Sequence, residues 1–215
     1  MKLKLLIMAL TVTFSAGLMA ADANKPHEHQ GLVKPIKGAP PELKLTAADQ
    51  AKLAKGEPVR KRITIGDTGG RGVVVQDIQA PKDVVMGRIL DFNNYPKMVD
   101  KVKLTKNYET KGGHVKTHFI IGNFAFEMEY FIDHVVKKDK GYVTWTLDYS
   151  RNSDLVDSVG FWHAKVHPTK PGWTRLVYSA EIRLSSWVPG FVEDYFAEKG
   201  LVNATAWVKK ESEKR

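Results

Sequence analysis

The chain has 215 residues, contains no cysteine and carries a formal net charge of +9 at pH 7. The lack of cysteine excludes disulfides, cysteine-ligated metal sites and thiol nucleophiles. The length suffices for one domain with a complete hydrophobic core and some additional segments. The lysines are scattered, without an arginine-rich run or a recognition motif, so we expect no nucleic-acid partner. The positive charge indicates either a solvated basic face or transient docking to an anionic membrane surface.

Residues 1–23 have the pattern of a secretory signal peptide. Two lysines precede an apolar stretch at residues 5–18, and the small residues that follow offer cleavage after Ala23 or after Ala20. We therefore expect an exported protein, periplasmic if the source is a Gram-negative bacterium. Because no cysteine follows the apolar stretch, a bacterial lipoprotein anchor is excluded.

Residues 24–58 are predicted to form a flexible, proline-rich leader followed by a short helix. The helix is expected at residues 46–55, where Thr46 is a suitable N-cap. The leader contains His27 and His29 without a third ligand, so we expect no metal site.

Residues 59–215 read as one β-rich domain. Strands are predicted at 59–65 and 72–80, and Pro81 then begins an amphipathic helix. After a short helical turn, period-2 alternation and glycine turns predict further strands at residues 102–111, 114–121, 124–134, 142–149, 158–167 and 173–184.

The alternation also predicts which side chains face inward. Met128 and Tyr130 share one face of their strand, whereas Glu127 and Glu129 share the other. A register error of one residue would instead bring both glutamates inside and favour acid–base catalysis. The inner faces are rich in tyrosine and tryptophan, which either fill a core or line a pocket.

The last segment, residues 188–215, is predicted to be a long helix with one broad apolar side. Lys199 and Asn203 interrupt that side. Either the helix bends there and the lysine reaches solvent, or both residues hold the polar end of a ligand. The predicted ligand-binding residues, from the inner strand faces and this helix, are Phe119, Phe126, Met128, Tyr130, Trp145, Tyr149, Trp162, Leu176, Tyr178, Ala180, Tyr195, Lys199 and Asn203.

Three stretches, residues 78–102, 160–182 and 187–210, carry a resemblance to a known family. In their order and in the pattern IQAPKDVVMGRILDFNNYP, the chain resembles the START-like superfamily, also called SRPBCC. The closest branch is the polyketide cyclase/lipid-transport group that includes the coenzyme Q-binding START proteins. Met86 and Asp100 depart from the pattern, since the family usually has Trp and Pro there.

The resemblance implies an α+β helix-grip fold, in which a curved antiparallel sheet wraps around a long C-terminal helix and encloses a deep apolar cavity. Members of the superfamily bind lipids, sterols, quinones or polyketides. Some are enzymes, but the family has no invariant catalytic set, so the resemblance carries over no catalytic residue and no cofactor.

We therefore expect an exported carrier of a hydrophobic ligand such as a lipid, quinone or isoprenoid. Two alternatives stay open: a cyclase or dehydrase that uses a pocket tyrosine or Lys199, and a protein-interaction module whose pocket is filled by its own aromatic rings. A gate, able to dip into a membrane, is predicted where the polar loop 151–157 meets Trp187, Val188 and Phe191.

Overall fold

The computed structural model describes residues 21–64, 70–124, 126–185 and 201–214. Its strands are β1 (Val59–Thr64), β2 (Gly70–Ile78), β3 (Val102–Lys111), β4 (His114–Gly122), β5 (Glu127–Lys137), β6 (Tyr142–Leu147), β7 (Leu155–Val166) and β8 (Thr174–Leu184). They form one eight-stranded sheet in the order β1-β2-β8-β7-β6-β5-β4-β3. Every neighbouring pair is antiparallel, as expected for strands joined by short turns.

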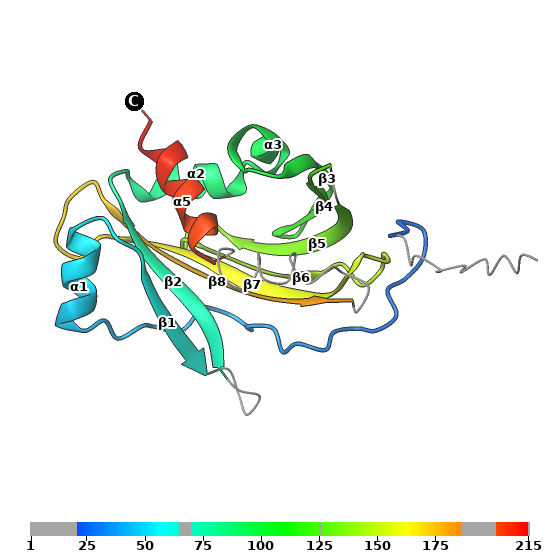
Figure 1. Cartoon of the computed structure of the whole chain (residues 1–215), viewed down its shortest axis with the longest axis horizontal. Helices are drawn as coiled ribbons and strands as arrows, with labels where there is room; N and C mark the ends of the chain where they lie inside the picture. The colour runs from blue at the N-terminus through cyan, green and yellow to red at the C-terminus, as the bar shows by residue number, and fades with distance from the viewer. Residues whose placement is uncertain (1–20, 65–69, 125, 186–200, 215) are drawn as a thin grey trace, which may run out of the picture.

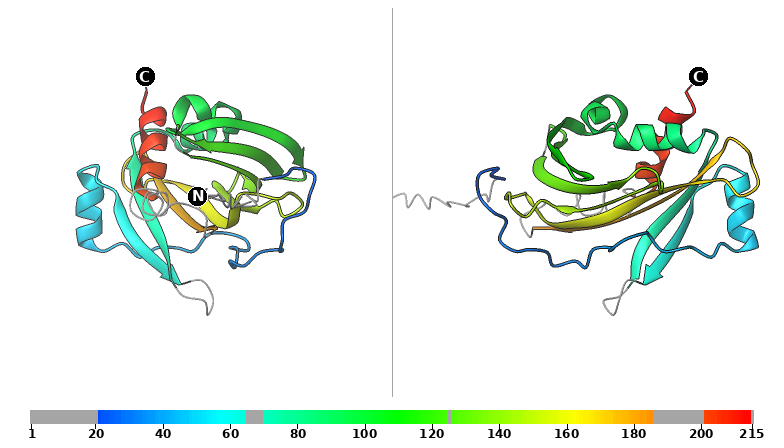
Figure 2. Two further views of the ribbon diagram at one scale, coloured as in Figure 1. Left: turned by 45° about the vertical axis from the view of Figure 1, so that its right-hand side comes forward. Right: turned by 180° about the vertical axis from the view of Figure 1, so that it is seen from behind.

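The helices are α1 (Ala47–Ala54), α2 (Lys82–Leu90), the 3-10 turn η1 (Phe92–Asn94), α3 (Tyr95–Met98) and α5 (Leu201–Ser212). Figure 1 shows α2, α3 and α5 on one side of the sheet, while α1 lies beside β1 and β2. The two views of Figure 2 show the sheet curving beneath the three helices. In the part of the chain described above, no helix is long and apolar enough to cross a membrane.

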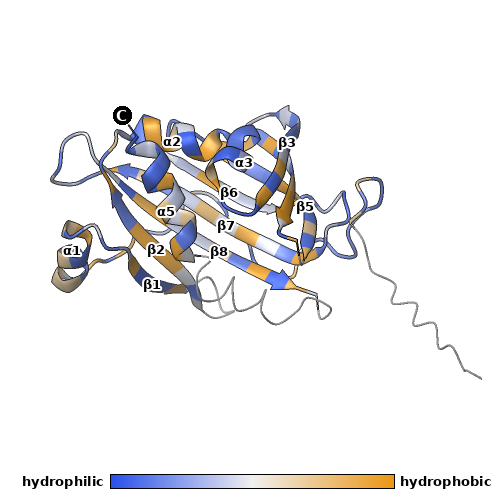
Figure 3. Cartoon of the chain, turned by 45° about the horizontal axis from the view of Figure 1, so that its top comes forward, coloured by the Kyte–Doolittle hydropathy of each residue, from blue (hydrophilic) through white to orange (hydrophobic). Residues whose placement is uncertain are grey.

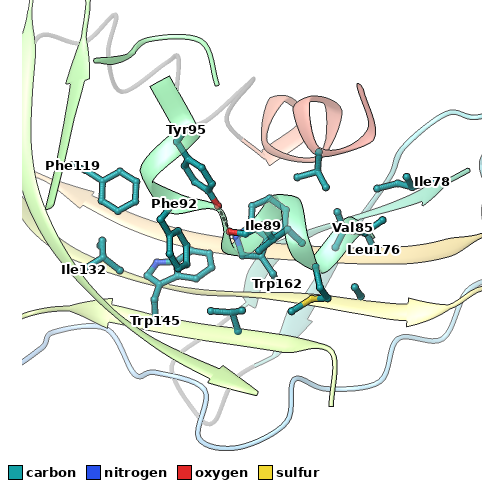
Figure 4. Packing of buried hydrophobic residues seen from close by; sticks show 14 of the residues in the cluster. Ile78, Val85, Ile89, Phe92, Tyr95, Phe119, Ile132, Trp145, Trp162 and Leu176 are labelled. Atoms are coloured by element: carbon teal, nitrogen blue, oxygen red, sulfur yellow. Dashed lines mark hydrogen bonds between the residues drawn. The ribbon is translucent and has the colours of Figure 1, made fainter. Parts of the chain in front are cut away.

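The main core lies between the concave face of the sheet and these helices. Helix α2 contributes Val85, Met86 and Ile89, all fully buried, because its apolar side chains recur at helical spacing. Figure 4 shows Val85 and Ile89 packed beside Trp162 and Leu176 from the sheet. The alternation of hydrophobic and hydrophilic residues along the strands in Figure 3 explains how one face is buried.

A buried ion cluster joins β2 to β8 and to the residue that follows β7. The carboxylate of Asp77 accepts hydrogen bonds from Arg175 Nε at 2.7 Å and from His167 Nε2 at 2.8 Å. Burial opposes the charge of Asp77, but the bonds from Arg175 and His167 outweigh it, so the pKa of this carboxyl lies below its ordinary value.

The N-terminal segment differs from the flexible leader that its composition predicts. Residues 21–45 run along the convex side of the sheet, opposite the helices (Figure 1). The backbone N–H groups of Leu32 and Val33 both donate to Oδ2 of the fully buried Asp157, at 2.7 Å. Nε2 of His27 donates to the carbonyl of Val156 at 2.9 Å. These partners are distant in sequence, so composition alone did not reveal them.

The short helix α1 agrees with the sequence prediction. Thr46 accepts a hydrogen bond from the N–H of Asp49, whose carboxylate accepts the N–H of Thr46, which completes a capping box. Leu53 of this helix packs with Val73 and Phe161 on the convex side of the sheet. A second, smaller core therefore covers this part of the outer face.

Candidate functional site

A cavity of about 1010 Å³ lies between the concave face of the sheet and helices α3 and α5. Strands β4 to β8 contribute its lining, and the segment between α3 and β3 closes one side. Eight of the predicted ligand-binding residues line it: Phe119, Phe126, Tyr130, Trp145, Trp162, Tyr178, Ala180 and Asn203.

Three predicted residues lie elsewhere. Met128 and Leu176 point to the expected side but are fully buried in the core, away from the cavity wall. Tyr149 follows the end of β6 at Leu147, where strand alternation no longer determines direction. Its hydroxyl donates to Oδ1 of Asp157 at 2.8 Å, on the side of the N-terminal segment.

The remaining predicted residues lie outside the described part of the chain. These are Tyr195 and Lys199 of the pocket and Trp187, Val188 and Phe191 of the gate. The other half of the predicted gate, the loop after β6, is described and is bonded to β5. Ser153 Oγ accepts the N–H of Phe131 at 3.1 Å.

Aromatic rings form the floor of the cavity. Tyr178 lies between Trp162, with ring centroids 4.1 Å apart, and Trp145, with centroids 5.9 Å apart. The Trp145 indole lies across Gly160, its antiparallel partner on β7, where an added Cβ would come 2.2 Å from the indole. The rings line the cavity without filling it, unlike the collapsed pocket expected of a protein-interaction module.

Two lining aromatics were missed among the predicted ligand-binding residues. Tyr95 comes from α3, and its hydroxyl donates to the carbonyl of Ile89 at 2.6 Å (Figure 4). Its ring centroid lies 5.0 Å from that of Trp207 on α5 and 6.2 Å from that of Phe119 on β4. These contacts join α3, α5 and β4 at one wall of the cavity. The position of Trp207 on the apolar side of the terminal helix was the available signal.

His134 of β5 is the imidazole that lines the cavity, and sequence analysis also missed it. Its Nδ1 lies 3.1 Å from the carbonyl of Val115. A carbonyl only accepts, so Nδ1 carries the proton and the neutral ring has an acceptor at Nε2. Burial lowers the pKa of His134 to about 4, and the ring stacks on Phe92 with centroids 4.1 Å apart. The imidazole is therefore neutral at pH 7.

Structural comparison decides the fold. A STAR-related lipid transfer protein from Xanthomonas axonopodis aligns with a TM-score of 0.57 at 8% identity, covering 73% of this chain and 94% of that one. The Zhui aromatase/cyclase from Streptomyces sp. R1128 aligns with a TM-score of 0.55 at 12% identity, covering 72% and 94%. The chain has a START-like fold.

A third match agrees with this result. The human StarD13 lipid transfer and protein localization domain aligns with a TM-score of 0.52 at 15% identity, covering 80% of this chain and all of that one, 100%. No family model and no curated protein matches the sequence. The predicted α+β helix-grip architecture is thus confirmed from structure.

Two hydroxyls inside the START-like cavity lack a hydrogen-bond partner among the described residues. They belong to Tyr130, whose ring stacks on Phe119 with centroids 5.1 Å apart, and to Tyr178 on the floor. Burial raises the pKa of both phenols above the ordinary value, so both are neutral donors. Together with His134, they provide donors and an acceptor within an otherwise aromatic wall.

Three glutamates on the strands of the START-like cavity point to the outer face of the sheet. Glu181 lies between the inward residues Ala180 and Ile182, and its Oε2 accepts from Nε of the buried Arg71 at 3.1 Å, as expected for an outward side chain. Glu127 and Glu129 stay on the outer face, as the alternation predicted. Glu127 pairs with Lys103 at 2.6 Å. The described residues contain no cluster of three or more potential metal ligands.

Proposed function

We propose that the protein binds and carries a hydrophobic small molecule, such as a lipid, quinone or isoprenoid, in this cavity. The supporting observation is the cavity itself, about 1010 Å³ with aromatic rings along its floor and walls. Burial of alkyl carbon gives ~0.8 kcal/mol per methylene, so about ten methylenes give ~8 kcal/mol. That free energy corresponds to a dissociation constant of about 1 μM without any reactive group.

The polar atoms inside the cavity favour a ligand with a hydroxyl group. Nε2 of His134 is a neutral acceptor, and leaving such an acceptor unpaired against an apolar ligand costs about 1–3 kcal/mol. A phenol or alcohol hydroxyl of the ligand donates to it, and the hydroxyls of Tyr130 and Tyr178 provide further donors within the same cavity. We therefore propose that a neutral, hydroxyl-bearing end of the ligand enters this cavity.

Two probes that differ in one hydrogen-bond donor test both parts of the proposal. Para-nonylphenol and para-nonylanisole share the alkyl chain and ring, but only the phenol donates. Quenching of Trp145 and Trp162 fluorescence reports binding of either probe. We expect both probes to bind, with the phenol about tenfold tighter, since one hydrogen bond contributes ~1 kcal/mol or more.

Variants separate the two parts. In His134→Phe, the phenol should bind only as tightly as the anisole, because the acceptor is gone. His163→Phe is the matched control, since His163 is also a buried histidine but does not line the cavity. If neither probe binds and no lipid appears in an organic extract of the purified protein, the carrier function is wrong. Equal affinity for the probes would reject only the role of His134.

A second function, catalysis by a cyclase or dehydrase mechanism, is favoured by one observation. A neutral imidazole acceptor lines one apolar cavity together with two phenols that have no hydrogen-bond partner among the described residues, which is the arrangement needed for general base and acid. Incubation with a β-hydroxyketone of nonyl chain length distinguishes the two functions. A carrier returns the compound unchanged, whereas a dehydrase releases water and forms the enone, and this loss should depend on His134.

Delivery to an anionic membrane is the remaining part of the proposal. Phe124 is fully exposed between Gly122 and Phe126, both of which line the cavity. A lone exposed aromatic at the edge of an apolar cavity suits insertion at a membrane interface. The basic character of the chain adds about 1 kcal/mol for each lysine near an anionic surface. Export, which the first residues suggest, would bring the protein to such a surface.

A further inference from the structure

An aspartate between β6 and β7 bonds the backbone of Ala21 near the start of the N-terminal segment. At the point where β6 has ended, Oδ2 of Asp154 accepts the N–H of Glu129 on β5 at 2.7 Å. Its other oxygen, Oδ1, accepts the backbone N–H of Ala21 at 3.0 Å. The side chain thus bonds both strand β5 and the N-terminal segment.

Among the described residues, no basic side chain compensates the charge of this carboxylate. Asp154 is part-buried, and the described residues offer it no ion pair with lysine, arginine or histidine. Burial, together with the negative charges of Glu129 and Glu127, raises the pKa of Asp154. A part-buried anion beside two others favours a nearby cation.

The residues that follow Ala21 are held at the same place. The N–H of Asp22 donates to the carbonyl of Asn152 at 2.9 Å, and the N–H of Asn152 donates to the carbonyl of Asp22 at 3.0 Å. Cleavage after Ala23, the first choice from sequence, would remove these bonds and the bond from Ala21 to Asp154. Cleavage after Ala20 would retain all of them.

We infer that the chain is processed between Ala20 and Ala21 and that the new α-ammonium group of Ala21 pairs with the carboxylate of Asp154. In this hydrolysis, water adds to the carbonyl of Ala20 and the bond to the nitrogen of Ala21 breaks. The peptide 1–20 leaves as a carboxylate, and the freed amine takes up a proton. The ammonium lies where the amide nitrogen now lies, so the ion pair needs no rearrangement of the loop.

The first experiment is N-terminal sequencing and intact mass of the full-length protein after expression in a Gram-negative host. We expect a mature protein in the periplasm that begins at Ala21. A protein that begins at Asn24, or one that keeps Met1, would overturn the inference.

The second experiment tests the ion pair. Mature chains that begin at Ala21 are compared with chains that carry one added glycine, which keep the amide N–H but move the ammonium away. Asp154→Asn should lower the melting temperature of the first chain by roughly 4 °C more than that of the second. The matched control is Asp157→Asn, which bonds the same segment through Leu32 and Val33 and should act equally in both chains. Equal losses for Asp154→Asn would refute the pairing.

Discussion

Acid stability provides a direct test of the buried imidazole in the cavity. His134 is 5% exposed, stacks on Phe92 and has its pKa lowered from 6.5 to about 4 by burial. In the unfolded chain the ring regains its ordinary pKa. Between pH 6.5 and pH 4 the unfolded state therefore binds more protons than the folded state. The free energy of unfolding falls as the pH is lowered through this window.

The magnitude follows from the two pKa values of His134. A difference between 6.5 and about 4 corresponds to about 3 kcal/mol, present in full above pH 6.5 and lost by pH 4. This is a large share of the roughly 5–15 kcal/mol that stabilises a typical domain. Burial also lowers the pKa of His163 to about 4, so a second loss is expected in the same window.

Urea unfolding at pH 7, 6, 5 and 4.5 measures these losses. The pH dependence of the wild type should be steeper than that of His134→Phe, because phenylalanine keeps a ring on Phe92 but cannot bind a proton. The His163→Phe variant should remove only its own share of the slope, and the double variant should remove both. If His134→Phe lost stability as steeply as the wild type, the imidazole would not be a buried neutral group and the argument would fail.

Three further outcomes follow from packing, charge and exposure. Gly160→Ala should destabilise the fold by about 2 kcal/mol or more, because the new Cβ would overlap the Trp145 indole. Gly87→Ala is the matched control, since the space around this mid-helix residue is open, and it should stabilise the fold by up to ~1 kcal/mol. Chemical denaturation measures both changes. Asp77→Asn should cost about 3–5 kcal/mol by removing the buried carboxylate that pairs with the mostly buried guanidinium of Arg175, and a wild-type melting curve would contradict this. Phe124→Ser should reduce sedimentation of the protein with phosphatidylglycerol vesicles without changing its melting temperature. Val166→Ser changes another exposed apolar residue and should leave sedimentation unchanged. Equal effects of the two variants would reject the membrane contact.

Local patterns in the sequence were sufficient for most of the described elements and for the side of the sheet that most strand residues face. The strand β3 begins and ends at the predicted residues, and the alternation along β5 placed Tyr130 inward and Glu129 outward. The capping box at Thr46 was equally local. These features depend on neighbours a few residues apart, so one-dimensional periodicity contains the information.

The sequence analysis did not locate the cavity wall within that buried face. Met128 and Tyr130 share a face, yet only the second lines the cavity, because the position of the helices above the sheet decides which inward residues are covered. His134 continues the same alternation, and its lowered pKa comes from the Phe92 ring and other groups that surround it in space.

By itself, the sequence determined the described strands and helices, the inward faces and the START-like order of elements, since each follows from residues close along the chain. Only the tertiary structure decided which rings enclose the cavity, that a neutral histidine lies in its wall, and that residues 21–45 pack on the convex face. The physical reason is that burial and hydrogen bonds such as that from Ala21 to Asp154 join residues more than a hundred positions apart, |i−j| = 133 in this case. No local pattern encodes such a pairing.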